Sequence, residues 1–118
     1  MKINFRIKNE KNNFLYKILN GMGIENYKWN ILEDDIYNIE NLQSFFGVTE
    51  YDGQTFKEKI KNNIYYIVFV EIIGKSLNSE DIIKITIVDQ EFVDIETSKQ
   101  QIIDIIKENI IKNGFIEE

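Results

Sequence analysis

Residues 64–73 read IYYIVFVEII and form the most apolar run of the chain. The run is rich in β-branched and aromatic side chains, which suit the pleated surface of a β-sheet. Both alternating sets of side chains are apolar, which is typical of a central strand with two covered faces. A buried helix has a similar composition, but Asn62-Asn63 and Gly74 bracket only ten residues. We therefore predict a central strand that is covered on both faces.

Glu71 is the one charged residue in this run. A carboxylate that faces the core would need a cation or a set of hydrogen-bond donors. Glutamate is rarely fully buried. We therefore predict that the strand emerges from the core near its end and that the carboxylate of Glu71 reaches water.

The hydrophobic period divides the rest of the chain into further elements. We predict strands over residues 2–8, 27–32, 83–88 and 91–96, with the last two joined in a hairpin. We predict helices over residues 12–22, 39–46, 55–61 and 99–113. Trp29 lies on an alternating strand, so we assign it to the core.

These elements predict a single α+β domain over residues 1–118. About five strands form a mostly antiparallel sheet, and the N-terminal and C-terminal helices pack on one face of it. The other face of the central strand must then be covered as well. Either the less regular region 34–61 folds over it, which we favour, or a second copy of the chain does. We therefore expect a monomer or a homodimer.

The residue inventory excludes several kinds of site. The chain has no cysteine and no histidine, which excludes disulfides, the usual zinc sites and catalysis by a histidine base. The sequence contains neither GxGxxG nor GxxxxGK followed by serine or threonine, the two glycine-rich patterns that bind nucleotides. We therefore predict no catalytic residue, no metal site and no cofactor. The N-terminus lacks the apolar core of a signal peptide, and the longest apolar run is too short for a bilayer, which predicts a cytoplasmic protein without membrane contact.

The negative charge of the chain is concentrated in one segment. Residues 33–53 contain six acidic residues and no basic residue, which equals the net charge of −6 of the whole chain. A net-acidic chain argues against nucleic acid as a ligand, because phosphate binding needs clustered lysine and arginine. The charge favours a basic protein as the partner.

Aromatic residues are interleaved with the acids of this segment. Aromatic anchors surrounded by charge are typical of protein interfaces. We therefore predict a partner-binding surface on an acidic loop. Its residues are Glu33, Asp34, Asp35, Tyr37, Tyr51 and Asp52. In the structural alternative, Phe45 and Phe46 cap the sheet and the acids keep the loop soluble.

The predicted hairpin carries a second group of acids. They are Asp89, Glu91, Asp94 and Glu96. Charged side chains on an edge strand prevent sheets from joining edge to edge. We therefore predict that the hairpin contributes an edge strand.

Two functions are compatible with these residues. We favour a small acidic module that binds a basic protein through residues 33–53, for example an immunity-type inhibitor of a basic toxin or nuclease. The alternative is a carboxylate-based enzyme, or a protein that binds a small ligand or a metal, in which Glu71 acts with the acidic segment.

Several short motifs carry a resemblance to a known family. They are FLYKIL at 14–19, YKWNI at 27–31, NNIYYIVF at 62–69 and KNGF at 112–115. Together with the preceding short strand, they resemble domain of unknown function 2691, an uncharacterised domain family of Gram-positive bacteria. The resemblance covers residues 2–32 and 60–116. It implies the fold and carries over no catalytic residue.

Overall fold

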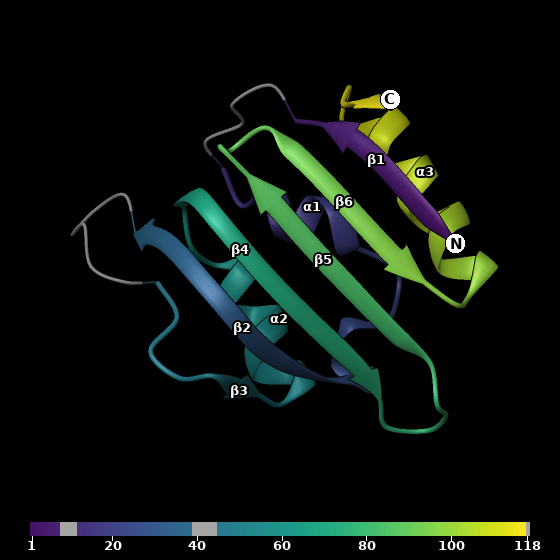
Figure 1. Cartoon of the computed structure of the whole chain (residues 1–118), viewed down its shortest axis with the longest axis horizontal. Coiled ribbons are helices and arrows are strands. Elements are labelled where there is room, and N and C mark those ends of the chain that lie inside the picture. Colours follow the sequence, from purple (N-terminus) through teal and green to yellow (C-terminus); the bar gives the residue numbers. More distant parts are fainter. Residues whose placement is uncertain (8–11, 39–44, 118) are drawn as a thin grey trace.

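The computed structural model describes residues 1–7, 12–38 and 45–117. Within these residues, seven strands form one sheet in the order β3-β2-β4-β5-β6-β1-β7, and all neighbours are antiparallel (Figure 1). The strands are β1 (Lys2–Arg6), β2 (Tyr27–Asn38), β3 (Glu50–Tyr51), β4 (Tyr65–Ser76), β5 (Ile82–Val88), β6 (Phe92–Thr97) and β7 (Ile116–Glu117). The predicted α+β class and the antiparallel sheet are therefore confirmed, whereas the predicted number of strands was too low.

The helices of the described chain all lie on one face of this sheet (Figure 1). They are α1 (Phe14–Leu19), α2 (Gly53–Lys61) and α3 (Gln100–Lys112), together with the 3₁₀ turn η1 (Ile24–Asn26). The predicted helix over residues 39–46 lies mostly outside the described residues. We refer to the opposite side of the sheet as the open face, because no described element covers it.

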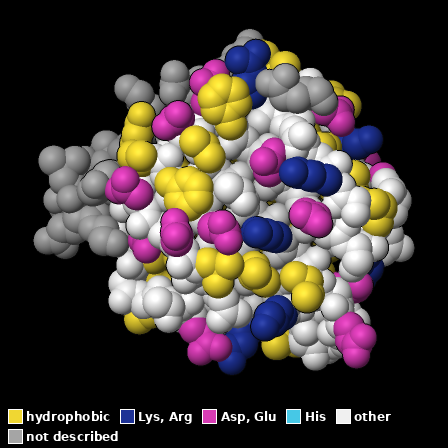
Figure 2. Space-filling view, in the orientation of Figure 1, with side chains coloured by type: hydrophobic (Ala, Val, Ile, Leu, Met, Phe, Trp, Pro, Cys, Tyr) yellow, Lys and Arg dark blue, Asp and Glu magenta, His cyan; other side chains and the backbone are white. Residues whose placement is uncertain are grey.

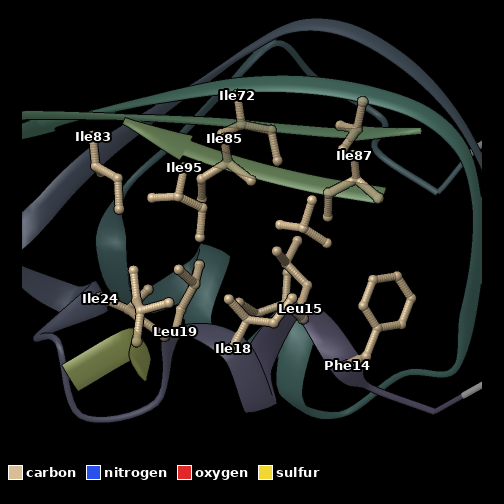
Figure 3. Close-up of a cluster of buried hydrophobic side chains, with 14 of the residues drawn as sticks. Phe14, Leu15, Ile18, Leu19, Ile24, Ile72, Ile83, Ile85, Ile87 and Ile95 are labelled. Atoms are coloured by element: carbon tan, nitrogen blue, oxygen red, sulfur yellow. The ribbon is translucent and has the colours of Figure 1, made fainter. Parts of the chain in front are cut away.

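The core forms between the sheet and the helices (Figure 3). Apolar residues of α1 and η1 meet the inward side chains of the central strands. In Figure 3 these are Phe14, Leu15, Ile18, Leu19 and Ile24 below, and Ile72, Ile83, Ile85, Ile87 and Ile95 above. Trp29 is fully buried, as predicted, and its ring stacks on Phe56 of α2 with 4.6 Å between centroids. The indole N–H of Trp29 donates to the carbonyl oxygen of Ile24 at 3.0 Å.

Strand β4 is central, as the sequence predicts, because it pairs with β2 on one side and β5 on the other. The prediction that both of its faces are covered was wrong. Tyr65 is fully buried under the helices, whereas the neighbouring Tyr66 is 38% exposed on the open face. The described part of region 34–61 packs on the helix side instead, where Phe45 and Phe46 are buried. One covered face is enough for stability because an antiparallel sheet can expose its other face to water.

The hairpin of β5 and β6 is confirmed, and its turn residues Asp89 and Gln90 have φ angles of 57° and 55°. The edge-strand prediction was wrong, because β6 lies between β5 and β1. The edges of the described sheet are the two-residue strands β3 and β7. None of the described helices is long and apolar enough to span a membrane.

Candidate functional site

The side chains that point outward from β2, β4, β5, β6 and β1 form rows that run across the open face. Side chains alternate along each strand, so residues that pair across strands share a face. We name two of these rows. The apolar row is Phe69, Val88 and Phe92, on β4, β5 and β6. The acidic row is Glu33, Glu71 and Asp94, on β2, β4 and β6, with Thr86 of β5 between the last two.

Large apolar side chains are exposed on and around this face. Phe92 is 46% exposed, and Val88 beside it is 36% exposed. Leu32, Tyr66 and Ile82 add further exposed apolar surface from β2, β4 and β5. Figure 2 shows hydrophobic side chains next to acidic ones over this face of the sheet. A contiguous apolar surface with a polar border is typical of a protein-interaction site.

The acidic row contains an unfavourable pair of charges. Glu33 and Glu71 are direct cross-strand partners, and like charges in this position destabilise a sheet. The Nζ of Lys84 lies 3.6 Å from Oε1 of Glu71, which partly compensates one member of the pair. Within the described residues, Glu33 and Asp94 form no ion pair. The row therefore keeps uncompensated negative charge beside the apolar row.

The sequence prediction for Glu71 was correct in part. Its side chain is partly exposed on the open face, as predicted. The strand does not end there, however, because β4 continues to Ser76. The carboxylate reaches water because this face of the sheet is not covered.

Three of the predicted partner-binding residues lie together in β2. Glu33, Asp34 and Asp35 are exposed and pair with β4, so the prediction of an acidic loop was wrong for this stretch. The backbone of Tyr37 pairs with Tyr66, and the side chain of Tyr37 lies outside the described part of the structure.

The other two predicted residues, Tyr51 and Asp52, lie on the helix side. Tyr51 is only 8% exposed, and its ring packs against Phe46 and Phe56 at centroid distances of 5.5 and 6.2 Å. Asp52 is the N-cap of α2. The structure therefore brings Glu33 and Asp35 to the open face, pairs Asp34 with the buried Val70 on the other side of the sheet, and separates Tyr51 and Asp52 from the open face.

Asp52 accepts two hydrogen bonds from Thr55. Its Oδ1 accepts from the backbone N–H of Thr55 at 2.9 Å, and its Oδ2 accepts from the hydroxyl at 2.8 Å. The backbone hydrogen bond, and then the hydroxyl, hold the pKa of the Asp52 carboxyl below its ordinary value. The carboxylate thus stabilises the start of α2.

We expect Asp52→Ala to destabilise the protein at neutral pH and to do so less in acid. Because the folded-state pKa of Asp52 is lowered, its contribution is complete above the unfolded-state pKa and is lost as the pH falls through the folded-state value. Urea unfolding of the wild type and the variant at about pH 7 and about pH 3 measures this. Asp52→Asn, which keeps an acceptor, should be the milder variant. An equal stability difference at both pH values would contradict a charged cap.

A shallow hollow of about 600 Å³ lies at the end of the open face nearest the N-terminus. Ile73 and Ile82 give it an apolar part, and Lys84 and Glu96 add charges. Its remaining lining residues are Met1, Glu80, Thr97 and Ser98. Among the described residues, no group of three acidic side chains is placed to hold a metal ion.

Sequence reasoning missed the apolar half of this surface. Phe69 carries no signal of exposure, because the run around it is apolar in both alternating sets. Val88 and Phe92 each fall in the polar alternating set of their strand, which is the signal that could have placed them on the exposed face. Asp94 was noticed as an acid, but the sequence does not show that it shares a row with Glu33 and Glu71.

The comparisons with known proteins agree with the motifs. The model of a family described as protein of unknown function, DUF2691, matches residues 1–85. The uncharacterized protein YncE of Bacillus subtilis (strain 168) is 28% identical over 131 residues, which cover 96% of this chain and 86% of that protein. No solved structure matches significantly. Since the family model covers well over half of the sequence, the chain belongs to the DUF2691 family.

Proposed function

We propose that this protein is a binding module that docks a basic protein on the open face of its sheet. The observation that carries the proposal is an exposed apolar surface, centred on Val88 and Phe92, with uncompensated carboxylates beside it. Interfaces combine an apolar centre, often with aromatic anchors, and a polar rim in this way. The carboxylates select a cationic partner and accelerate its association.

A basic partner fits this face better than a second copy of the chain. The protein carries a net charge of −6, and the acidic row crosses the middle of the open face. Two such faces would bring like charges together, which costs free energy unless cations intervene. We therefore expect the isolated protein to be a monomer.

One concrete form of this function is an immunity-type inhibitor. A toxin or nuclease that acts on a polyanion needs a cationic cleft. An acidic, partly apolar sheet face would cover such a cleft and compete with its substrate. We further propose that the protein acts in the cytoplasm.

A charge-reversal experiment tests the binding face. In the open-face variant, Glu33, Asp35 and Asp94 are changed to lysine. In the matched control, the exposed acids Glu58, Asp104 and Glu108 on α2 and α3 are changed to lysine, which alters the net charge equally. The wild type, the open-face variant and the control are each immobilised and exposed to cytoplasmic extract. The association rate of any retained basic protein is then measured at several salt concentrations.

We expect the wild type and the helix-face control to retain the same basic protein. The open-face variant should bind it at least about tenfold more slowly at low salt, with a weaker dependence on salt. An association rate that is the same for the open-face variant and for the control would contradict the proposal.

A further inference from the structure

We infer that the partner presents an amphipathic helix with lysine or arginine along one flank, and that this helix lies across β4, β5 and β6. The inference rests on the proposed function and specifies the chemistry of the partner. It follows from the spacing of the apolar and acidic rows on the open face, which the strand register fixes.

The apolar row matches the repeat of a helix. Phe69, Val88 and Phe92 lie on three adjacent strands, and strands are about 4.8 Å apart, so the row is about 10 Å long. Apolar residues at positions i, i+4 and i+7 of a helix span about 10.5 Å. A helix that lies across the strands can therefore contact all three members of the row with one stripe.

The acidic row lies at a distance that the flank of the same helix can reach. Glu71 follows Phe69 by two residues on β4, and Asp94 follows Phe92 by two residues on β6. Two residues of a strand cover about 7 Å. A helix with its side chains is about 10–12 Å wide, and a lysine or arginine keeps its stem on apolar surface while its charge reaches outward. Cations on one flank of the docked helix therefore meet the acidic row.

A single extended strand fits this surface less well. Its successive side chains point alternately toward and away from the sheet. Only one line of side chains of such a strand would then face the sheet. An extended strand could therefore contact the apolar row or the acidic row but not both. The two parallel rows thus favour a helix over an extended peptide.

The pair of Glu33 and Glu71 is a second observation that points to a cation. The two carboxylates repel one another in the free chain, and only Glu71 has an ion-pair partner among the described residues, Lys84 at 3.6 Å. A cation on the flank of the docked helix would lie between the two carboxylates and relieve the repulsion.

Two synthetic peptides of equal composition test the inference directly. Each has about 18 residues, long enough to form a helix, and carries a leucine stripe at i, i+4 and i+7. In the flank peptide the lysines lie beside the stripe, and in the top peptide they lie on the opposite face. We expect the flank peptide to bind the wild-type protein about tenfold more tightly than the top peptide.

Variants of the protein then separate the contributions of the two rows. Glu33→Gln with Asp94→Asn should remove the preference for the flank peptide. Val88→Thr with Phe92→Thr should weaken the binding of both peptides, and threonine has the β-branched shape that strands favour. The helix-face triple variant Glu58→Lys, Asp104→Lys and Glu108→Lys should keep the preference. Circular dichroism confirms that each variant is folded.

The outcomes distinguish the inference from the function on which it rests. Equal binding of the two peptides would overturn the helix arrangement. The proposed binding function would still stand in that case if the open-face variant failed to bind the native partner. If that variant still bound the native partner, the proposed function itself would fail. A wild-type dimer that dissociates on Val88→Thr with Phe92→Thr would show that a second copy occupies the face, which would overturn both.

Discussion

Gly53→Ala is expected to displace α2 and to lower the free energy of unfolding by about 3 kcal/mol. A Cβ atom at Gly53 would lie 2.6 Å from the carbonyl oxygen of Tyr27, and closer still to that of Glu25. Both atoms belong to the backbone, which cannot rotate away as a flexible side chain does. Tyr27 is held by its pairing with Ser76 at the start of β2. The helix must therefore move.

Gly47→Ala is the matched control for this substitution. The added Cβ has no neighbour within 4 Å at Gly47. The free energy of unfolding of this variant should therefore be close to that of the wild type. For Gly53→Ala we expect the melting temperature to fall by about 10 °C. The fluorescence of Trp29 reports the same event, because Trp29 is the only tryptophan and stacks on Phe56 of α2. Equal melting of the two variants would show that α2 docks differently.

The regular helices and strands could be predicted because the spacing of apolar residues along the sequence indicates which side chains face the core. The stripe of apolar residues over 12–22 and the alternation over 83–88 correspond to α1 and β5. The helix over 55–61 and the long C-terminal helix follow the same logic. In each of these segments, local pattern and tertiary packing require the same structure.

The extension of β2 could not be predicted from local sequence. Glu33-Asp34-Asp35 has the composition of a loop, because acidic residues are disfavoured in strands. In the structure this stretch continues β2 because β4 provides a partner over its whole length. A register shift between Ile31 and Glu33 accommodates the change. Pairing with a distant strand therefore overrides the local preference.

The two faces of β4 look alike in the sequence but differ in the structure. Tyr65 and Tyr66 are adjacent and chemically identical, yet only Tyr65 lies under the helices. Which face the helices cover depends on how the whole chain is connected, and within the apolar run only Glu71 marks the exposed face. Of the acidic row, only Glu33 was among the predicted partner-binding residues, and of the apolar row, Phe69 was assigned to a covered face.

Tyr51 and Asp52 show why acids next to aromatic residues are an ambiguous signal. The side chain of Tyr51 belongs to an aromatic cluster with Phe46 and Phe56. Asp52 precedes a helix, and aspartate is among the favoured N-cap residues. A search for caps before predicted helices would have assigned Asp52 to the start of α2.

Tyr65→Phe is the second change with a large expected effect, because one hydroxyl joins the sheet to two helices. The Tyr65 hydroxyl accepts from the backbone N–H of Leu15 in α1 at 3.1 Å. It donates to the carbonyl oxygen of Ile60 in α2 at 2.9 Å. Leu15 lies in the first turn of α1 and Ile60 in the last turn of α2, where backbone groups lack partners within the helix.

Removing the hydroxyl leaves both of these backbone groups without this partner, at a cost of about 1–3 kcal/mol for each buried group. Burial raises the pKa of Tyr65 far above its ordinary value, so the phenol stays neutral and able to donate. We therefore expect the loss of stability to be constant from about pH 5 to about pH 9. Urea unfolding across this range measures it. Tyr66→Phe, one residue away on the open face, is the matched control and should change stability by less than about 0.5 kcal/mol. If both variants lost the same stability, or if the loss at Tyr65 changed with pH, the hydroxyl would not be the link between β4 and the two helices.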